Sequence, residues 1–238
     1  IPAVQMKEGD GFRTISYIEL GRRTSDTSYN LKKLGIEKGD RIAILSESRP
    51  EWSVAFFGII SCAGIVVPMD IKLSDTEIQF ILGDSEAKCI FASDKFIERV
   101  KTLNIKLPNL KNIISLDDTA SNDVLLLRDF KVPENEIAHR DIYPEDTAII
   151  VYTSGTTGIA KGVELTYKNM LFEVKELNEY VKFNAQDHFL SILPLNHMLE
   201  ITSGLIAPLY AGACITYCDS LKPTNIIKLM QETKTTAM

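Results

Sequence analysis

Short and long apolar segments alternate along most of the chain. Residues 41–46 (RIAILS) and 89–93 (CIFAS) have the length and the composition of buried strands. Longer stretches with helical spacing of apolar positions lie between such runs. An alternation of buried strands and helices is typical of parallel sheets. We therefore predict an α/β fold, with largely parallel sheets flanked by helices on both faces.

The boundaries of the predicted elements follow from capping and turn residues. SYIE at 16–19 and SDTE at 74–77 match the capping box, in which a Ser hydroxyl and a Glu carboxylate bind free amides at a helix start. The polar interval 117–147 is predicted to be a surface excursion. Strands are predicted at 41–46, 65–67, 89–93, 112–116, 148–152, 162–167, 188–193 and 214–217. Helices are predicted at 16–34, 49–63, 74–83, 94–101, 168–181 and 197–210, and from Pro223 onward.

Two segments of 18 residues, 52–69 and 201–218, carry no charged side chain. Their length alone would suffice to cross a bilayer. Glycine and proline interrupt both, so each is interpreted as a buried helix followed by a buried strand. The chain also opens without a basic-then-apolar leader, so we expect no signal peptide and a cytoplasmic location.

The composition narrows the class of protein further. The chain has 238 residues, of which 45% are apolar and 24% charged, and these are ordinary globular values. Its 26 basic and 32 acidic residues leave a net charge of −6 without any basic block, which argues against a nucleic-acid partner. The four cysteines form no CxxC pair, and the three histidines are scattered. Free, buried thiols and no zinc site are expected.

The segment 152–162 (YTSGTTGIAKG) has the clearest chemistry. Its glycines allow successive backbone amides to turn toward an anion; they are Gly155, Gly158 and Gly162. Its hydroxyl groups can donate to phosphate oxygens; they belong to Thr153, Ser154, Thr156 and Thr157. Lys161 adds a mobile positive charge, and the preceding strand places the loop where α/β folds bind ligands. These features predict a phosphate-binding loop. It is no Walker A loop, because Gly162 follows Lys161 and a strand comes next.

Once extended to YTSGTTGIAKGVELTYKN, this segment resembles the AMP-binding signature of the adenylate-forming superfamily. That superfamily includes acyl-CoA synthetases, peptide-synthetase adenylation domains and luciferases. GIEKGDRIAIL and AGIVVPMD resemble its opening segments, and LPLNHMLE resembles a stretch typical of long-chain fatty acyl-CoA synthetases. The resemblance extends from about Thr14 to the end. Ala160 stands where the family usually has proline, so we expect a more mobile and less pre-organised loop.

The resemblance implies a two-step reaction. ATP and a carboxylic acid form an acyl-adenylate and pyrophosphate, and the acyl group then passes to coenzyme A. Carried over by position, the ATP phosphates would contact Thr153, Ser154, Gly155, Thr156, Thr157, Gly158 and Lys161. Thr156 and Lys161 would be catalytic: Thr156 would bind Mg²⁺, and Lys161 would hold the leaving pyrophosphate. His197 would border the acyl and adenylate pocket, and no acid–base role is required of it.

The resemblance also implies a division into subdomains. Residues 41–181 would form a first α/β subdomain that carries the phosphate loop. Residues 1–40 and 182–238 would form part of a second, and the C-terminal domain of the family would be absent. The family's adenine- and ribose-binding segments and its late catalytic lysine would then be missing too. We therefore expect this incomplete N-terminal portion to be inactive alone and to dimerise through an exposed sheet edge.

The sequence favours a fatty acid–CoA ligase with fatty acid, ATP and CoA as substrates, and with peripheral membrane contact for the lipid. Alternatives stay open. One is a ligase for an aryl or succinylbenzoate acid, or for acyl carrier protein. Another is a non-catalytic remnant that binds only a nucleotide or a partner, and a third is an unrelated kinase or GTPase. His197 and Glu200 lie one helical turn apart, but two ligands are too few for a metal site.

Overall fold

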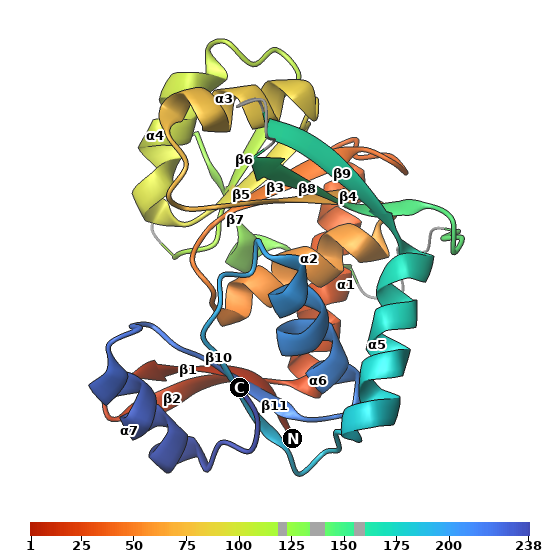
Figure 1. Cartoon of the computed structure of the whole chain (residues 1–238). Coiled ribbons are helices and arrows are strands. Elements are labelled where there is room, and N and C mark those ends of the chain that lie inside the picture. The colour runs from red at the N-terminus through yellow and green to blue at the C-terminus, as the bar shows by residue number, and fades with distance from the viewer. Residues whose placement is uncertain (119–122, 134–140, 155–159) are drawn as a thin grey trace. The chain divides into compact units, whose positions relative to one another are not determined.

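Figure 1 shows a computed structural model of the chain. The structure describes residues 1–118, 123–133, 141–154 and 160–238. The chain forms two compact units, each of which is described by itself. The first unit contains Ile1–Gly21, Ser48–Ser53 and Lys168–Met238, and the second contains Arg22–Glu47 and Val54–Tyr167. The subdomains inferred from the family resemblance, 41–181 and 1–40 with 182–238, stay a prediction.

The second unit is built on a sheet to which seven strands of the described residues contribute, in the order β7-β6-β5-β3-β4-β8-β9. Every neighbouring pair is parallel except β8 and β9, which are antiparallel. The strands are β3 (Arg41–Leu45), β4 (Ile65–Met69), β5 (Cys89–Ala92), β6 (Asn112–Ser115), β7 (Leu125–Leu126), β8 (Thr147–Ser154) and β9 (Ala160–Thr166). The central strands β3, β4 and β5 are almost continuously buried, as parallel strands covered on both faces must be.

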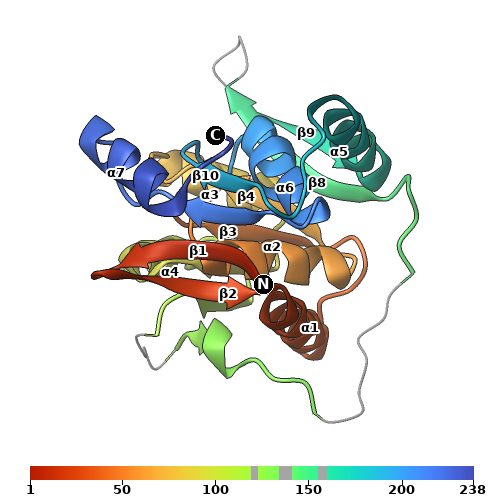
Figure 2. The same ribbon diagram turned by 90° about the horizontal axis from the view of Figure 1, so that it is seen from below.

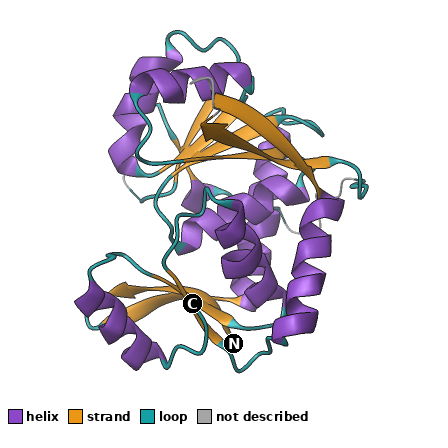
Figure 3. Cartoon of the chain, viewed as in Figure 1, coloured by secondary structure: helices purple, strands orange, loops and turns teal. Residues whose placement is uncertain are grey.

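Helices cover both faces of this sheet (Figure 3). On one face α3 (Asp75–Asp84) and α4 (Asp94–Asn104) pack their apolar side chains onto the strands (Figure 1). On the other face α1 (Tyr17–Lys33) and α2 (Pro50–Ser61) pack closely together. Gly58 of α2 leaves no room for a Cβ beside the side chain of Thr27 of α1, so the two helices approach closely at this point. The predicted fold class is confirmed.

The first unit contains a four-stranded sheet among the described residues, in the order β10-β11-β1-β2. Its strands are β1 (Pro2–Glu8), β2 (Gly11–Ser16), β10 (His188–Ser191) and β11 (Cys214–Tyr217). β10, β11 and β1 are parallel, and β1 and β2 form an antiparallel hairpin (Figure 2). The remaining helices are α5 (Tyr167–Val181), the π-helix η2 (Glu200–Ile206), α6 (Ala207–Tyr210) and α7 (Pro223–Thr233).

Most predicted elements lie within a few residues of the observed ones, but three features were missed or misjudged. The N-terminal hairpin was missed, because its strands mix polar and apolar side chains without a clear alternation. The predicted surface excursion 117–147 also contains β7 and a 3₁₀ turn, Leu127–Asp129, whose Leu127 is buried. The predicted helix 197–210 is instead the π-helix η2 followed by the short α6.

At both predicted helix starts a serine hydroxyl accepts from the backbone amide three residues further on. At α3 the reciprocal capping box is complete, since Ser74 binds the Glu77 amide and Glu77 binds the Ser74 amide. At α1 the amide of Glu19 donates to Ser16 Oγ at 3.2 Å. All four cysteines are free thiols. Cys62 and Cys89 are buried as expected, whereas Cys214 and Cys218 are only half-buried.

Candidate functional site

The hairpin of β8 and β9 holds the two ends of the predicted phosphate loop. β8 is parallel to β4 and ends at Ser154, so the loop begins at the carboxyl end of a parallel strand, as predicted. Gly155, Thr156, Thr157 and Gly158 lie outside the described residues, and of Ser154 only the backbone is described. The predicted contacts of these residues, including Mg²⁺ at Thr156, therefore stay predictions.

Thr153 and Lys161 are brought together at the base of this loop. They are direct cross-strand partners in the β8–β9 hairpin, and both are exposed. Side chains of directly paired residues project from the same face of a sheet, with Cβ atoms about 5 Å apart. One hydroxyl donor and one ammonium group thus stand on one face, where an anion could accept from both.

Tyr152, which precedes Thr153, contacts the C-terminal part of α3. Its hydroxyl donates to Asp84 Oδ2 at 2.6 Å, and its ring meets that of Phe80 edge to face, with centroids 6.5 Å apart. Burial and the neighbouring Asp84 carboxylate raise the pKa of Tyr152, so its hydroxyl keeps the proton that it donates. The base of the hairpin is therefore held against α3.

Gly162 makes room for that ring. It is the cross-strand partner of Tyr152, and a Cβ added to Gly162 would lie 2.9 Å from Ile150 Cγ2 and 3.3 Å from Tyr152 Cζ. Gly162 was predicted both to end the phosphate loop and to begin the strand 162–167. In the structure it lies within β9, where it faces the Tyr152 ring. The roles of Tyr152 and Asp84 were missed, because nothing local in the sequence links two residues 68 positions apart.

His197 belongs to the first unit, in the turn before η2. It is exposed, and its amide donates to the carbonyl of Pro194 at 3.1 Å. Its own carbonyl accepts from the amides of Glu200 and Ile201, both at 3.0 Å. The imidazole is therefore presented from a turn whose backbone is held on both sides. That His197 borders an acyl pocket stays a prediction.

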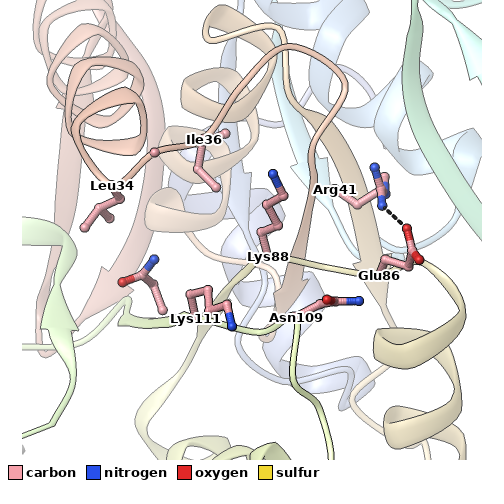
Figure 4. A pocket seen from close by; sticks show the side chains of 9 residues that line it. Leu34, Ile36, Arg41, Glu86, Lys88, Asn109 and Lys111 are labelled. Atoms are coloured by element: carbon pink, nitrogen blue, oxygen red, sulfur yellow. Dashed lines mark hydrogen bonds and ion pairs between the residues drawn. The ribbon is translucent and has the colours of Figure 1, made fainter.

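A hollow in the second unit is lined by residues near the amino ends of three strands (Figure 4). It measures about 320 Å³ and lies at the amino ends of β3, β5 and β6, where Arg41, Lys88 and Lys111 form a basic row. Arg41 is paired with Glu86 at 2.8 Å and Lys88 with Asp40 at 2.8 Å. None of the predicted site residues lines this hollow. Because two of its three cations are already neutralised by neighbouring carboxylates, we assign no ligand to it.

No group of three or more His, Cys, Asp or Glu side chains is arranged to hold a metal ion within 1–118, 123–133, 141–154 and 160–238. No helix in these same ranges combines the length and the apolarity needed to cross a membrane.

Sequence relatives of this chain act on different acids. The chain is 28% identical to malonate–CoA ligase of Arabidopsis thaliana over 92% of its length. It is 30% identical to fatty acyl-CoA synthetase A of Dictyostelium discoideum over 95%, and 31% identical to 4-coumarate–CoA ligase of Vanilla planifolia over 87%. It spans 36%, 36% and 38% of these three proteins.

Solved structures share the fold. ATP-bound MatB from Rhodopseudomonas palustris is 25% identical with a TM-score of 0.84, and the match covers 98% of this chain and 45% of that one. The anthranilate–CoA ligase AuaEII with anthranoyl-AMP has a TM-score of 0.88 at 22% identity, over 99% of this chain and 46% of that one. The AMP-binding enzyme family matches residues 2–238, almost the entire sequence. The chain therefore belongs to the AMP-binding enzyme family.

Proposed function

We propose that the protein containing this chain is a fatty acid–CoA ligase. In the first step a carboxylate oxygen attacks the α-phosphorus of ATP, and the bond from that phosphorus to the bridging oxygen breaks, so that pyrophosphate leaves. In the second step the sulfur of coenzyme A attacks the acyl carbon, its thiol proton is lost, and AMP leaves. Membership in the AMP-binding family and the CoA ligases among its relatives support this reaction class.

The observation that carries the proposal is the pairing of Thr153 with Lys161 at the base of the loop. The first step concentrates negative charge on pyrophosphate as it departs. Donors fixed in advance where that charge develops stabilise the transition state more than the ground state. Lys161 supplies a cation there, and Thr153 supplies a hydroxyl on the same face. A magnesium ion bound by Thr156 would neutralise further phosphate charge.

The acid is proposed to be a long-chain fatty acid. Support comes from LPLNHMLE at 193–200, which resembles the long-chain synthetases, and from the fatty acyl-CoA synthetase among the relatives. Malonate and coumarate ligases are similarly related, so the acid has to be tested directly. The alternatives are another acid, acyl carrier protein as acceptor, or a remnant that binds a nucleotide without turnover.

One assay separates these possibilities. The full-length protein is incubated with ATP, Mg²⁺ and a panel of palmitate, malonate, coumarate and succinylbenzoate, and pyrophosphate, ADP and acyl-CoA are measured. We expect release of pyrophosphate that depends on palmitate, and palmitoyl-CoA when CoA is added. Turnover only with another acid would overturn the choice of acid. Release of ADP, or no product with any acid, would overturn the ligase.

The same assay tests the 238-residue chain by itself. This chain spans about 36% of the length of its relatives from Arabidopsis and Dictyostelium, so we propose that it carries only part of the active site. No acyl-hydroxamate should form when hydroxylamine is added to trap acyl-adenylate. Light scattering would test the proposed dimer. Flotation with vesicles would test the proposed peripheral membrane contact. We propose that the protein is otherwise cytoplasmic.

A further inference from the structure

Glu200 is a buried acid at the first position of a rare kind of helix. Only 6% of the residue is exposed, and it begins the π-helix η2. Bonding of the π type is seen where the amide of Ala207 donates to the carbonyl of Thr202. Single π-helical turns are uncommon and occur frequently at functional sites. A carboxyl group buried at such a place is costly unless its surroundings satisfy it.

The surroundings of this carboxyl are closely fitted. Ser191, at the end of β10, donates its hydroxyl to Glu200 Oε1 at 2.5 Å. On the helix side, Gly204 lies so close that a Cβ there would overlap the carboxyl oxygens. No Lys, Arg or His in the described ranges pairs with Glu200. The carboxyl thus accepts a hydrogen bond from Ser191 and occupies the space that Gly204 leaves open.

Nearby groups are also buried and already bonded. Tyr217 is the cross-strand partner of Ser191 on β11, and its hydroxyl shares a hydrogen bond of 2.5 Å with Ser53. Burial raises the pKa of Glu200, although the hydrogen bond from Ser191 opposes that rise. The carboxyl accepts from Ser191 and fills the space beside Gly204. Its volume and its hydrogen bond to Ser191 are the properties that fix the turn.

The backbone connects this carboxyl to His197. The amide of Glu200 donates to the carbonyl of His197, and so does the amide of Ile201. A displacement of Glu200 would therefore release both bonds to the His197 carbonyl. The chain of contacts runs from β10 through Ser191 and Glu200 to the histidine.

We propose that Glu200 is a positioning residue, which fixes the start of η2 against β10 and so sets the place of His197. Gly204 is part of the same arrangement, because it provides the space that the carboxyl occupies. This inference rests on the proposed function only for the role of His197 beside the acid. The structural link from Glu200 to His197 stands independently of any activity.

The test uses Glu200→Ala and Glu200→Gln in the full-length protein, with Glu173→Ala as a control at an exposed glutamate of α5 in the same unit. The first readout is the imidazole NMR signal of His197, with histidines labelled selectively. The second is ATP–pyrophosphate exchange at varied acid and varied ATP. Glu200→Ala should move the His197 signal and lower kcat/KM for the acid about 10- to 100-fold, as small displacements of positioning groups do.

The pattern across variants identifies the mechanism. Glu200→Gln keeps the volume and can still accept from Ser191, so it should restore most of the activity. In Glu200→Ala the KM for ATP should change by less than about twofold, because the expected displacement affects only the acid. A general loss of folding would instead affect both substrates. The control should match the wild type. An unmoved His197 signal in folded Glu200→Ala, or equal losses for acid and ATP, would overturn the inference.

A double-mutant cycle separates Glu200 from general packing. With Glu200 present, Gly204→Ala should shift the His197 signal, because the new methyl group displaces the carboxyl. In the Glu200→Ala background the same change should have little effect. Additive effects would contradict the proposal. If the wild type shows no exchange dependent on an acid, the proposed function fails, while the NMR signals still decide the role of Glu200.

Discussion

At the scale of single residues, the pairing of Thr153 with Lys161 is the strongest functional signal in the described structure. A lysine is a mobile point charge, and its usefulness depends on where its strand holds it. Here β9 holds it opposite a threonine, at the place where the chain leaves β8. The sequence motif could predict the identity of these residues, but not their register, which depends on backbone pairing across the hairpin.

Removal of this cation tests the proposed step. Lys161→Ala in the full-length protein should slow adenylate formation roughly 10²-fold, the usual cost of losing one donor to a developing anion. The rate is measured as single-turnover release of pyrophosphate. Lys175→Ala, at an exposed lysine of α5, serves as the control. If the rate of the variant stays within about twofold of the wild-type rate, Lys161 has no part in the mechanism.

His188 should make the stability of the chain depend on pH. Its Nε2 lies 2.7 Å from Thr216 Oγ1 and 3.3 Å from Gln5 Nε2, and burial lowers its pKa from 6.5. The unfolded chain then binds a proton more readily than the folded chain does. The stability from this group is thus present above pH 6.5 and is lost as the pH falls through 6.5 to the folded-state pKa.

Urea unfolding at a series of pH values from neutral downward measures this effect. The free energy of unfolding of the wild type should decrease as the pH falls. His188→Gln should have a shallower slope over the same range, whatever its absolute stability. Equal slopes for the two proteins would show that His188 does not supply the effect.

At the scale of elements, the β8–β9 hairpin shows what pattern reasoning can predict. β8 could be predicted because it is a short run rich in β-branched side chains, and β9 because it follows the Gly-rich turn. Their antiparallel pairing could not, since the alternation of strands and helices pointed only to parallel neighbours. The π-helix η2 was equally hidden, because its apolar positions fit an ordinary helix.

Two glycine substitutions should have opposite effects on stability. Gly162→Ala pushes a methyl group against Ile150 and Tyr152, so it should destabilise by about 1–3 kcal/mol, as overpacking does. Gly21→Ala lies within α1 with nothing within 4 Å of its Cβ, so it should stabilise by about 0.5–1 kcal/mol. Thermal unfolding of both variants and the wild type gives the comparison. A neutral Gly162→Ala would mean that the Tyr152 ring is free to move.

At the scale of the whole molecule, the chain forms two units, each with its own sheet. The sheet of the first unit has β10 at one edge, and residues near Met238 partly cover it. The amide of Leu190 donates to the carbonyl of Ala237 at 3.0 Å, and the amide of Ala237 donates to the carbonyl of His188 at 3.3 Å. These bonds occupy groups that would otherwise be free to pair with another chain.

Removal of that cover should promote self-association. A chain that ends at Lys234 should show a larger average mass in light scattering than the chain that ends at Met238, at equal concentration. The reason is that the edge of β10 would then offer unpaired amides and carbonyls. An identical mass for the two chains, with both folded by circular dichroism, would contradict this role for residues 235–238.

The four free thiols also give this molecule built-in reporters. Cys62 and Cys89 are buried in the second unit, and burial raises the pKa of Cys89, so both should stay silent to alkylating reagents while that unit is closed. Cys214 begins β11 and Cys218 directly follows it, and both are half-buried in the first unit. Pulse alkylation followed by mass spectrometry would therefore time the opening of each unit separately, without any introduced cysteine.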